Sequence, residues 1–273
     1  MEFFDGKAES VELEKEIVQK INGIKAGGKG LKTLLIVQIG DNPVSEKYIG
    51  LKVKLCEKLG IPVQVHKISE HLPDATIISG VKALFESKEV NSGIIQLPLP
   101  RESLHDILDN IPVQKDVDMI SNESQKHFYE GDISRLSPVL WGVNIFLRKN
   151  EIDIRNKKVT VLGCGYLVGR PVARCLQEQG SFVEIVDAYT TGTPINADLV
   201  VLSAGIPNLV KGDDVSKGCH VIDFGSSIVD GRTVGDFDLM SQIDHLGIVS
   251  PSPGGMGPLV VRFLIMNHIL THL

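Results

Sequence analysis

The segment "VTVLGCGYLVGRPVARCL", Val159 to Leu176, decides the fold of the second half of the chain. Its first residues are apolar and β-branched, as in a buried strand, and its last residues have the apolar spacing of a helix. Between them, Gly163, Gly165 and Gly169 remove side chains where the strand turns into the helix. Such a turn lets backbone N–H groups and the helix dipole meet a pyrophosphate. The segment therefore predicts a dinucleotide-binding unit, with a purely structural tight turn as the alternative.

An acid follows at the end of the next predicted strand, "FVEIVD", which closes on Asp187. An acid about 20 residues beyond the glycines accepts hydrogen bonds from the adenosine ribose and repels a 2′-phosphate. The alternative is an ordinary solvated acid at a strand end. Cys164, within the turn, is interpreted as a small side chain rather than a redox switch, because nothing nearby in sequence would activate its thiol.

Strands and helices alternate along both halves of the chain. The first half predicts strands in "TLLIVQIG", "PVQVHKI" and "SGIIQL", with helices over 48–59 and around "TIISGVKALFES". The second half predicts a helix over 141–149 and strands in "KKVTVLG", "FVEIVD", "ADLVVLSAG" and "GCHVIDFG". This alternation is typical of α/β domains with parallel sheets.

Two segments set the expected domain boundaries. The stretch "DVDMISNESQKHFYEGDISRLSP", residues 116–138, is polar and is expected to be an irregular connection between domains. The final segment "GPLVVRFLIMNHILTHL" predicts a helix too apolar to lie free, so we expect it to pack on the first domain. We therefore expect one domain from residues 1–140 with 256–273, and a Rossmann-like domain from residues 141–255.

Composition excludes several classes of protein. A chain of 273 residues with 42% hydrophobic and 23% charged residues suits two globular domains in solution. The net charge of −6 and the absence of a basic cluster argue against nucleic acid as a partner. No secretory leader or membrane-length apolar run is found, so no membrane association is expected. The four cysteines lack C-x-x-C spacing, which disfavours a metal site and a disulfide framework and favours the reducing cytoplasm.

The first half also carries polar residues suited to catalysis. Tyr48 and Lys52 are four residues apart and share one helical face. A lysine in an apolar cleft has a lowered pKa and can carry protons; the alternative is a lysine that extends over an aromatic ring. Gln96, at a strand end, can orient a ligand or cap the loop. Asp116 and Asp118 of "KDVD" are ligand candidates, with a solvated turn as the alternative.

These motifs together resemble the methylenetetrahydrofolate dehydrogenase/cyclohydrolase family. Tyr48 with Lys52, "QLPLP", "KDVD", "GCGYLVGRP" and "SPSPGGMGP" occur in that family's order and spacing, and the resemblance covers nearly the whole chain from Asp5. It implies an N-terminal folate domain and a C-terminal dinucleotide domain with a cleft between them, usually in a homodimer. It implies that 5,10-methylenetetrahydrofolate is oxidised with NAD(P) and that the methenyl product is hydrolysed to 10-formyltetrahydrofolate.

The resemblance also implies roles for individual residues. Lys52 is the central catalytic residue, Gln96 interacts with it and with the reacting region, and Tyr48 orients the folate. Asp118 anchors the pterin, whose donor edge suits a carboxylate. The remaining implied folate contacts are Pro253, Gly254 and Gly255, and the implied dinucleotide contacts are Gly163, Cys164, Gly165, Tyr166, Leu167, Val168, Gly169, Asp187, Ala204 and Gly205.

The sequence departs from the family pattern on the folate side. Where the family has glycine and phenylalanine after "KDVD", this chain has Met119 and Ile120. A proline-cysteine-threonine-proline turn is represented only by "SPVLWG", and a threonine near the C-terminus is Val260. These changes keep open a degenerate, non-catalytic paralogue that binds folate or dinucleotide. A shikimate-type NAD(P) dehydrogenase, which shares the architecture, is the other alternative.

The cofactor side departs as well. NADP-using members of the family typically carry arginine at the position of Cys164 and a histidine-serine pair at the positions of Asp187 and Ala188. Arginine and serine would hold a 2′-phosphate, which a carboxylate opposes. The sequence therefore predicts that NAD is preferred over NADP.

Overall fold

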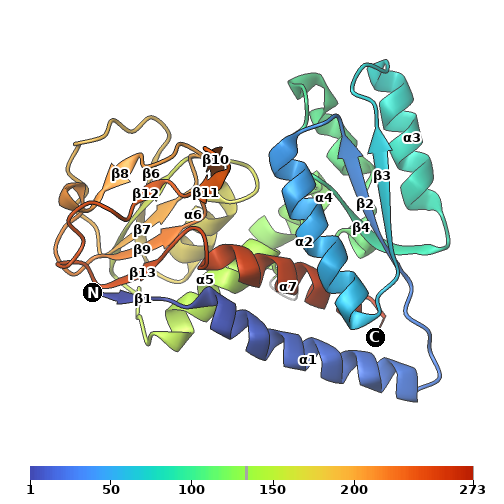
Figure 1. The fold of residues 1–273 in the computed structure, drawn as a ribbon, viewed down its shortest axis with the longest axis horizontal. Coiled ribbons are helices and arrows are strands. Elements are labelled where there is room, and N and C mark those ends of the chain that lie inside the picture. The colour runs from blue at the N-terminus through green and yellow to red at the C-terminus, as the bar shows by residue number, and fades with distance from the viewer. Residues whose placement is uncertain (133–134, 273) are drawn as a thin grey trace. The chain divides into compact units, whose positions relative to one another are not determined.

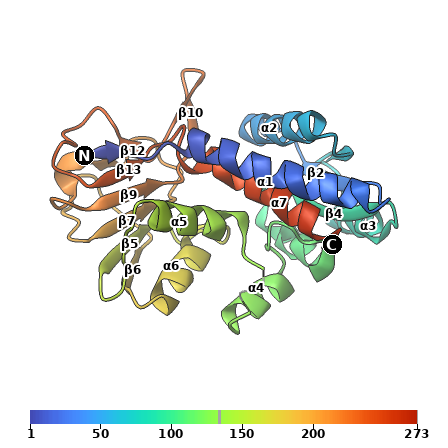
Figure 2. The same cartoon turned by 90° about the horizontal axis from the view of Figure 1, so that it is seen from below.

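The computed structural model describes residues 1–132 and 135–272, and the chain divides into two compact units (Figures 1 and 2). One unit is Met1–Glu12 with Pro138–Val260, and the other is Leu13–Ser137 with Val261–Leu273. This division differs from the expected boundaries chiefly at the N-terminus, which lies with the dinucleotide-type unit. The reason is that β1 (Glu2–Phe3) pairs in parallel with β13 (Ile248–Ser250).

Within its described residues, the unit Leu13–Ser137 with Val261–Leu273 contains a three-stranded parallel sheet. Its strands are β2 (Thr33–Ile39), β3 (Val63–Ile68) and β4 (Val90–Ile95), in the order β3-β2-β4. The helices α2 (Pro43–Leu59) and α3 (Asp74–Glu86) connect them. Because right-handed crossovers lead first to one side of β2 and then to the other, the two helices cover opposite faces of the sheet (Figure 1).

Helix α2 begins earlier than the sequence predicts. The Asn42 side chain accepts hydrogen bonds from the N–H groups of Val44 and Ser45, both at 3.0 Å, and Pro43 occupies the first turn. The helix ends at Gly60, whose φ of 67° is the left-handed conformation that glycine adopts most readily. These two ends fix the helix that carries Tyr48 and Lys52.

The segment 116–138 is less irregular than predicted. It contains α4 (Asn122–Tyr129), which begins where the Ser121 hydroxyl accepts a hydrogen bond from Ser124 N. The polar composition concealed this helix, which nevertheless buries Phe128. Residues 133–134 of the predicted connection lie outside the described residues. Two 3₁₀ helices precede α4, namely η1 (Glu102–Asn110) and η2 (Val113–Lys115).

Two long helices belong partly to each unit along the chain, α1 (Gly6–Ala26) and α7 (Met256–Leu270). The prediction that the last helix packs on the first domain is confirmed by its C-terminal half. There the Asn267 amide donates to the carbonyls of Val117 at 2.9 Å and Leu136 at 3.1 Å.

Among the described residues, the unit Met1–Glu12 with Pro138–Val260 contains a six-stranded parallel sheet in the order β1-β13-β9-β7-β5-β6. Its further strands are β5 (Lys158–Leu162), β6 (Phe182–Val186), β7 (Leu199–Leu202) and β9 (His220–Asp223), and its helices are α5 (Pro138–Lys149) and α6 (Gly169–Glu178). Shorter elements complete it: β8 (Val210–Lys211), η3 (Gly212–Asp214), β10 (Ser227–Val229), β11 (Arg232–Val234) and β12 (Phe237–Asp238).

The strand order of this sheet reverses at β5. The chain goes from β5 to β6 on one side and then returns to β7 on the other side. In open α/β sheets, ligands bind beyond the carboxyl ends of the strands at such a reversal. The glycine turn after Leu162 and the loop after Leu202 lie at these ends.

The structure also bears on two expectations drawn from composition, those about membrane-spanning segments and about the cysteines. No helix in residues 1–132 or 135–272 is both long and apolar enough to cross a membrane. All four cysteines are free thiols, and three of them, Cys56, Cys175 and Cys219, are buried.

Candidate functional site

A lysine and a glutamine form the centre of the candidate site in the first-half unit. Lys52, on α2, is 7% exposed, and its Nζ donates to Oε1 of Gln96 at 2.6 Å. Gln96 follows β4, and its Nε2 donates to the Leu97 carbonyl at 2.7 Å. Because the amide nitrogen is engaged by Leu97, the amide oxygen is turned toward the lysine. Tyr48 is half-buried one helical turn before Lys52.

The electrostatics of this centre favour proton exchange. Burial lowers the pKa of Lys52, and the carboxylate of Asp118 partly opposes that shift. Burial raises the pKa of Asp118 to about 6, an effect that Lys52 reduces and Asp116 adds to. A buried amine with a lowered pKa is neutral more often than an exposed one, so it is better able to accept a proton and return it.

The turn after "KDVD" is a built structure rather than a solvated loop. Asp116 is fully buried and accepts hydrogen bonds from the N–H groups of Ile120 at 3.3 Å and Ser121 at 2.8 Å. Met119 has a φ of 58°, in the left-handed region that favours glycine. Its carbonyl accepts from the Gln125 amide at 2.6 Å, and its side chain is buried. The turn therefore accommodates methionine, but its left-handed backbone conformation is strained for a residue that has a Cβ atom.

The three glycines after β5 differ in whether neighbouring atoms leave room for a side chain. A Cβ on Gly163, whose φ is 93°, would lie 2.6 Å from Ser203 O, and a Cβ on Gly169 would overlap the Gly163 carbonyl. Both positions therefore require glycine. A Cβ on Gly165 would meet no atom within 4 Å, so the backbone there borders open space. Tyr166, Leu167 and Val168 complete the turn and are half-buried.

The structure brings Asp187 to this turn. Its Oδ1 accepts a hydrogen bond from Cys164 N at 3.0 Å. Sequence reasoning missed a second charged neighbour, Arg170, whose Nε donates to Cys164 O at 3.0 Å and lies 3.4 Å from Cys164 Sγ. Its signal was its place at the start of the helix after the glycines, from which a long side chain reaches back over the turn.

The loop after β7 lies against the same turn. Ser203 Oγ donates to Leu162 O at 3.1 Å, and the N–H groups of Ala204 and Gly205 both donate to Oδ2 of Asp236, at 2.7 and 3.0 Å. Asp236 is a further residue that sequence reasoning missed.

The turn "PGG" follows β13 in the same unit. Gly254 has a φ of 112°, and Gly255 N donates to Pro251 O at 2.8 Å. A Cβ on Gly255 would overlap Ser250 Oγ, so only glycine fits. The predicted folate contacts Pro253, Gly254 and Gly255 thus belong to one compact unit, and Tyr48, Lys52, Gln96 and Asp118 belong to the other.

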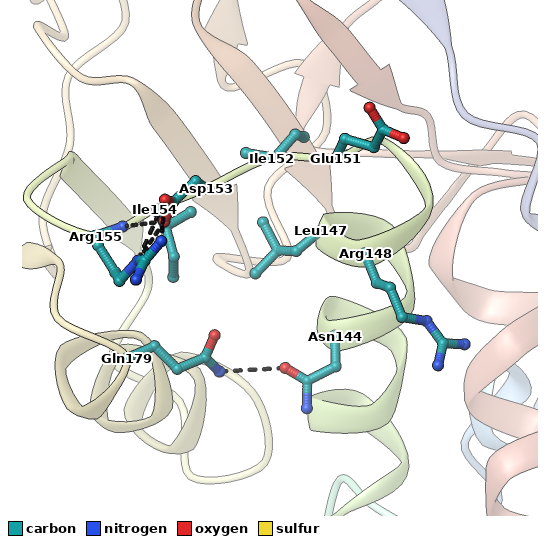
Figure 3. A pocket seen from close by; sticks show the side chains of 9 residues that line it. All are labelled: Asn144, Leu147, Arg148, Glu151, Ile152, Asp153, Ile154, Arg155 and Gln179. Carbon is teal, nitrogen blue, oxygen red and sulfur yellow. Dashed lines mark hydrogen bonds and ion pairs between the residues drawn. The ribbon is translucent and has the colours of Figure 1, made fainter.

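A surface cavity of 540 Å³ contains none of the predicted site residues (Figure 3). Its lining comes from the end of α5, the loop before β5 and Gln179. Two pairs of polar side chains in this lining are joined to each other: Gln179 Nε2 donates to Asn144 Oδ1 at 3.2 Å, and Arg155 Nη2 donates to Asp153 Oδ2 at 2.7 Å. The cavity precedes β5 in the chain, at the amino ends of the strands, which is the edge where ligands of such sheets do not bind.

Comparison with known proteins agrees with this geometry over both units. A family model described as the catalytic domain of tetrahydrofolate dehydrogenase/cyclohydrolase matches residues 4–118, and one described as its NAD(P)-binding domain matches residues 138–272. The bifunctional protein FolD of Campylobacter jejuni is 32% identical over 276 residues, which cover 98% of this chain and 97% of that protein.

Solved structures give the same result. The crystal structure of the Campylobacter jejuni bifunctional enzyme FolD matches with a TM-score of 0.87 and 30% identity, covering 99% of this chain and 98% of that one. The Trypanosoma brucei methylenetetrahydrofolate dehydrogenase-cyclohydrolase, complexed with NADP and an inhibitor, also has a TM-score of 0.87, with 29% identity and coverage of 99% and 96%.

Proposed function

Because the chain belongs to the tetrahydrofolate dehydrogenase/cyclohydrolase family, we propose that Lys52, Gln96 and Asp118 form its reaction centre. The chain is a bifunctional enzyme, a methylenetetrahydrofolate dehydrogenase and a methenyltetrahydrofolate cyclohydrolase. The matches over both units decide against a shikimate-type dehydrogenase and a non-catalytic paralogue. The observation that carries the proposed centre is the 2.6 Å bond from a buried lysine to an oriented amide oxygen.

Lys52 is the proton carrier of the hydrolytic step in this proposal. As a neutral amine it accepts a proton from the water that attacks the methenyl carbon. It then returns that proton to the bridge nitrogen as the carbon–nitrogen bond breaks. The new hydroxyl loses its own proton to solvent to give the formyl group, which accounts for the positive charge of the methenyl substrate. The lowered pKa of Lys52 supports the first transfer, because burial makes the neutral, proton-accepting amine more accessible than in an exposed lysine.

The neighbours of Lys52 position it and the substrate. Gln96 accepts one hydrogen bond from Nζ, so the other hydrogens or the lone pair of this nitrogen point away from the amide. Asp118 offers a carboxylate for the donor edge of the pterin, and Tyr48 offers an aromatic wall one turn from the lysine. When bound, NAD(P) supplies the hydride acceptor for the methylene carbon.

Absorbance of methenyltetrahydrofolate tests the two activities together. Formation from methylenetetrahydrofolate with a dinucleotide reports the dehydrogenase, and accelerated decay of added methenyltetrahydrofolate reports the cyclohydrolase. We expect both signals from the wild-type chain. A chain that shows neither, with either dinucleotide, would contradict the function.

The preference for NAD is proposed on Asp187 and the glycine turn. The carboxylate is hydrogen-bonded to Cys164 N, which places it beside the backbone expected to receive the pyrophosphate. With NAD it can accept bonds from the ribose hydroxyls, and with NADP it meets a phosphate of like charge. Arg170, also at Cys164, is a cation that moderates this repulsion. We expect NAD to be favoured roughly tenfold or more.

A homodimer in the cytoplasm completes the proposal. The dimer rests on the family, and the compartment rests on four cysteines that are all free thiols. Light scattering at micromolar concentration tests the assembly. A dimer mass is expected, and a strictly monomeric mass would contradict it.

A further inference from the structure

Two buried aspartates lie beyond the carboxyl ends of the strands in the dinucleotide unit, outside every residue assigned above to substrate or cofactor. Asp223 ends β9 and is 1% exposed, and Asp236 precedes β12 and is fully buried. Neither forms an ion pair with a lysine or arginine among the residues that the structure describes. Both carboxylates accept hydrogen bonds from backbone N–H groups of loop residues, so they organise these loops.

Asp236 holds the start of the loop after β7. Its Oδ2 accepts hydrogen bonds from Ala204 N at 2.7 Å and from Gly205 N at 3.0 Å. Gly205 has a φ of 69°, so the anchored backbone is in the left-handed conformation at this point. On the other side, the Gly205 carbonyl accepts from Ser227 Oγ at 3.0 Å. The peptide at Gly205 is therefore fixed from both sides.

Asp223 in turn holds Asp236. Its Oδ1 accepts from Gly225 N at 2.7 Å and from Asp236 N at 3.2 Å, and its Oδ2 accepts from Phe237 N at 3.0 Å. A Cβ on Gly225 would overlap the Asp236 carboxylate, and a Cβ on Gly235 would overlap that of Asp223. The Asp236 and Asp223 carboxylates thus lie directly against Gly225 and Gly235, and these close contacts restrict rotation of the Asp236 side chain.

Stability alone does not account for a carboxylate at position 236. Its second oxygen, Oδ1, is buried without a hydrogen-bond partner among the described residues. Burial raises its pKa, since the charged form is costly there, while the loop amides lower it. A buried acceptor left unpaired costs folding free energy that an apolar side chain would not.

We propose that Asp236 is a positioning residue for the dinucleotide, through the loop at Ala204 and Gly205. By engaging both amides it holds the loop beside the glycine turn in one conformation before the cofactor arrives, which reduces the ordering cost of binding. Asp223 keeps Asp236 in place. This inference rests on the proposed assignment of Ala204 and Gly205 as cofactor contacts.

Replacing Asp236 separates this role from a purely structural one. In Asp236→Ala both amides lose their acceptor, and we expect the dissociation constant and KM of the dinucleotide to rise at least tenfold, with a smaller change in kcat at saturation. Asp236→Asn keeps an acceptor oxygen for the amides and should bind within about threefold of wild type. The matched control is Asp214→Ala. Asp214 is a buried carboxylate of the same unit that accepts from Lys211 N at 3.0 Å, and its loss should leave dinucleotide affinity unchanged.

The outcomes separate the two proposals. A wild-type chain that binds dinucleotide, with a folded Asp236→Ala that binds it equally well, overturns the positioning role and leaves the cofactor site standing. Equal loss of affinity in Asp236→Ala and Asp214→Ala also overturns it, because general destabilisation then suffices. A wild-type chain that binds neither NAD nor NADP overturns the cofactor site and the inference together.

A measurement on the wild-type protein covers the case in which Asp236→Ala does not fold. Amide hydrogen exchange at Ala204 and Gly205 should be at least 100-fold slower than in an unstructured peptide, because both N–H groups are held by the carboxylate. Exchange at the unstructured rate would overturn the anchoring.

Discussion

Lys52 Nζ and Gln96 Oε1 are joined by a 2.6 Å hydrogen bond between a buried helix residue and the residue that follows β4, an edge strand of the three-stranded sheet. The two are 44 positions apart in sequence. Helix α2 supplies the amine, β4 supplies the amide, and the neighbouring Leu97 carbonyl fixes which end of the amide faces the lysine. The centre therefore depends on the register of β4 against β2, where Gln96 N donates to Val37 O at 2.8 Å.

If Asp118 binds the pterin as we propose, folate affinity should weaken when this carboxylate becomes protonated at acidic pH. Since its pKa is raised to about 6, the carboxylate is lost as pH falls through that value, and with it the anchor that we propose for the pterin. We expect the wild-type KM for methenyltetrahydrofolate to rise as pH falls from 7 to 5, after the uncatalysed hydrolysis is subtracted. Asp118→Asn should have a KM at least tenfold higher at pH 7.5 and lose this pH dependence. The exposed Asp106→Asn serves as control, and an unchanged profile in Asp118→Asn would refute the anchor.

Cofactor choice should follow the residues of the glycine turn. Wild-type kcat/KM is expected to be roughly tenfold or more higher with NAD than with NADP, because we propose that Asp187, which accepts a hydrogen bond from Cys164 N in the glycine turn, faces the ribose. Asp187→Ser combined with Cys164→Arg supplies a hydroxyl and a cation for the 2′-phosphate and should invert the ratio. Faster wild-type turnover at low NADP than at equal NAD would show that Asp187 does not read the ribose.

Arg170 allows a second test of the same turn. Its side chain lies at Cys164, so we propose that it is a cation that a 2′-phosphate would meet in the wild-type protein. Arg170→Gln should reduce the residual NADP activity severalfold and leave NAD activity nearly unchanged. An equal loss with both dinucleotides would assign Arg170 to the turn's structure instead.

At position 119, a glycine variant should be more stable than an alanine variant, which is the reverse of the usual order of stability. The Met119 φ of 58° strains any residue with a Cβ, and its buried side chain is lost in both variants. Met119→Gly relieves the strain and Met119→Ala does not, so the glycine variant should be the more stable by about 1 kcal/mol. Urea denaturation measures the difference. At Met266, buried within α7, alanine should instead be the more stable by about 1 kcal/mol, and the same order at both sites would contradict the strain.

A buried histidine should make the protein acid-labile. His268 is fully buried with Nδ1 2.7 Å from Ser92 Oγ, and burial with nearby His272 lowers its pKa to about 3. In the unfolded chain this histidine binds a proton near pH 6.5, whereas in the folded chain it stays neutral down to about pH 3. The contribution of neutral His268 to the free energy of unfolding is therefore complete above pH 6.5 and is lost as pH falls toward 3.

The loss from His268 between pH 6.5 and 5 should be about 2 kcal/mol in the free energy of unfolding. His268→Gln should show a correspondingly shallower loss in denaturant titrations, whereas the exposed His71→Gln should follow the wild type. Parallel pH profiles for wild type and His268→Gln would rule out this histidine as the source.

The sequence predicted the parts of the fold that depend on local pattern. The strand at 159–162, the glycines at 163 and 169 and the placement of Tyr48 and Lys52 one turn apart on a helix follow from spacing and apolar runs. Asp116 was named as a ligand candidate, but its burial under the backbone amides of Ile120 and Ser121 was not predicted, and the anchoring Asp236 was missed. In both cases the partners are backbone amides, which leave no mark in the side-chain pattern. Helix α4 was missed because it buries one aromatic residue within a polar stretch.

The hydrolysis rate of Lys52→Met tests the central claim most directly. Methionine keeps much of the length and apolar volume of the lysine side chain but can neither accept nor return a proton, and circular dichroism and the unfolding midpoint report whether the fold is kept. With the fold intact, the account predicts that decay of methenyltetrahydrofolate falls to the uncatalysed rate, while dinucleotide affinity is retained. Wild-type hydrolysis in a well-folded Lys52→Met protein would contradict the role of Lys52 and the reaction centre built on its bond to Gln96.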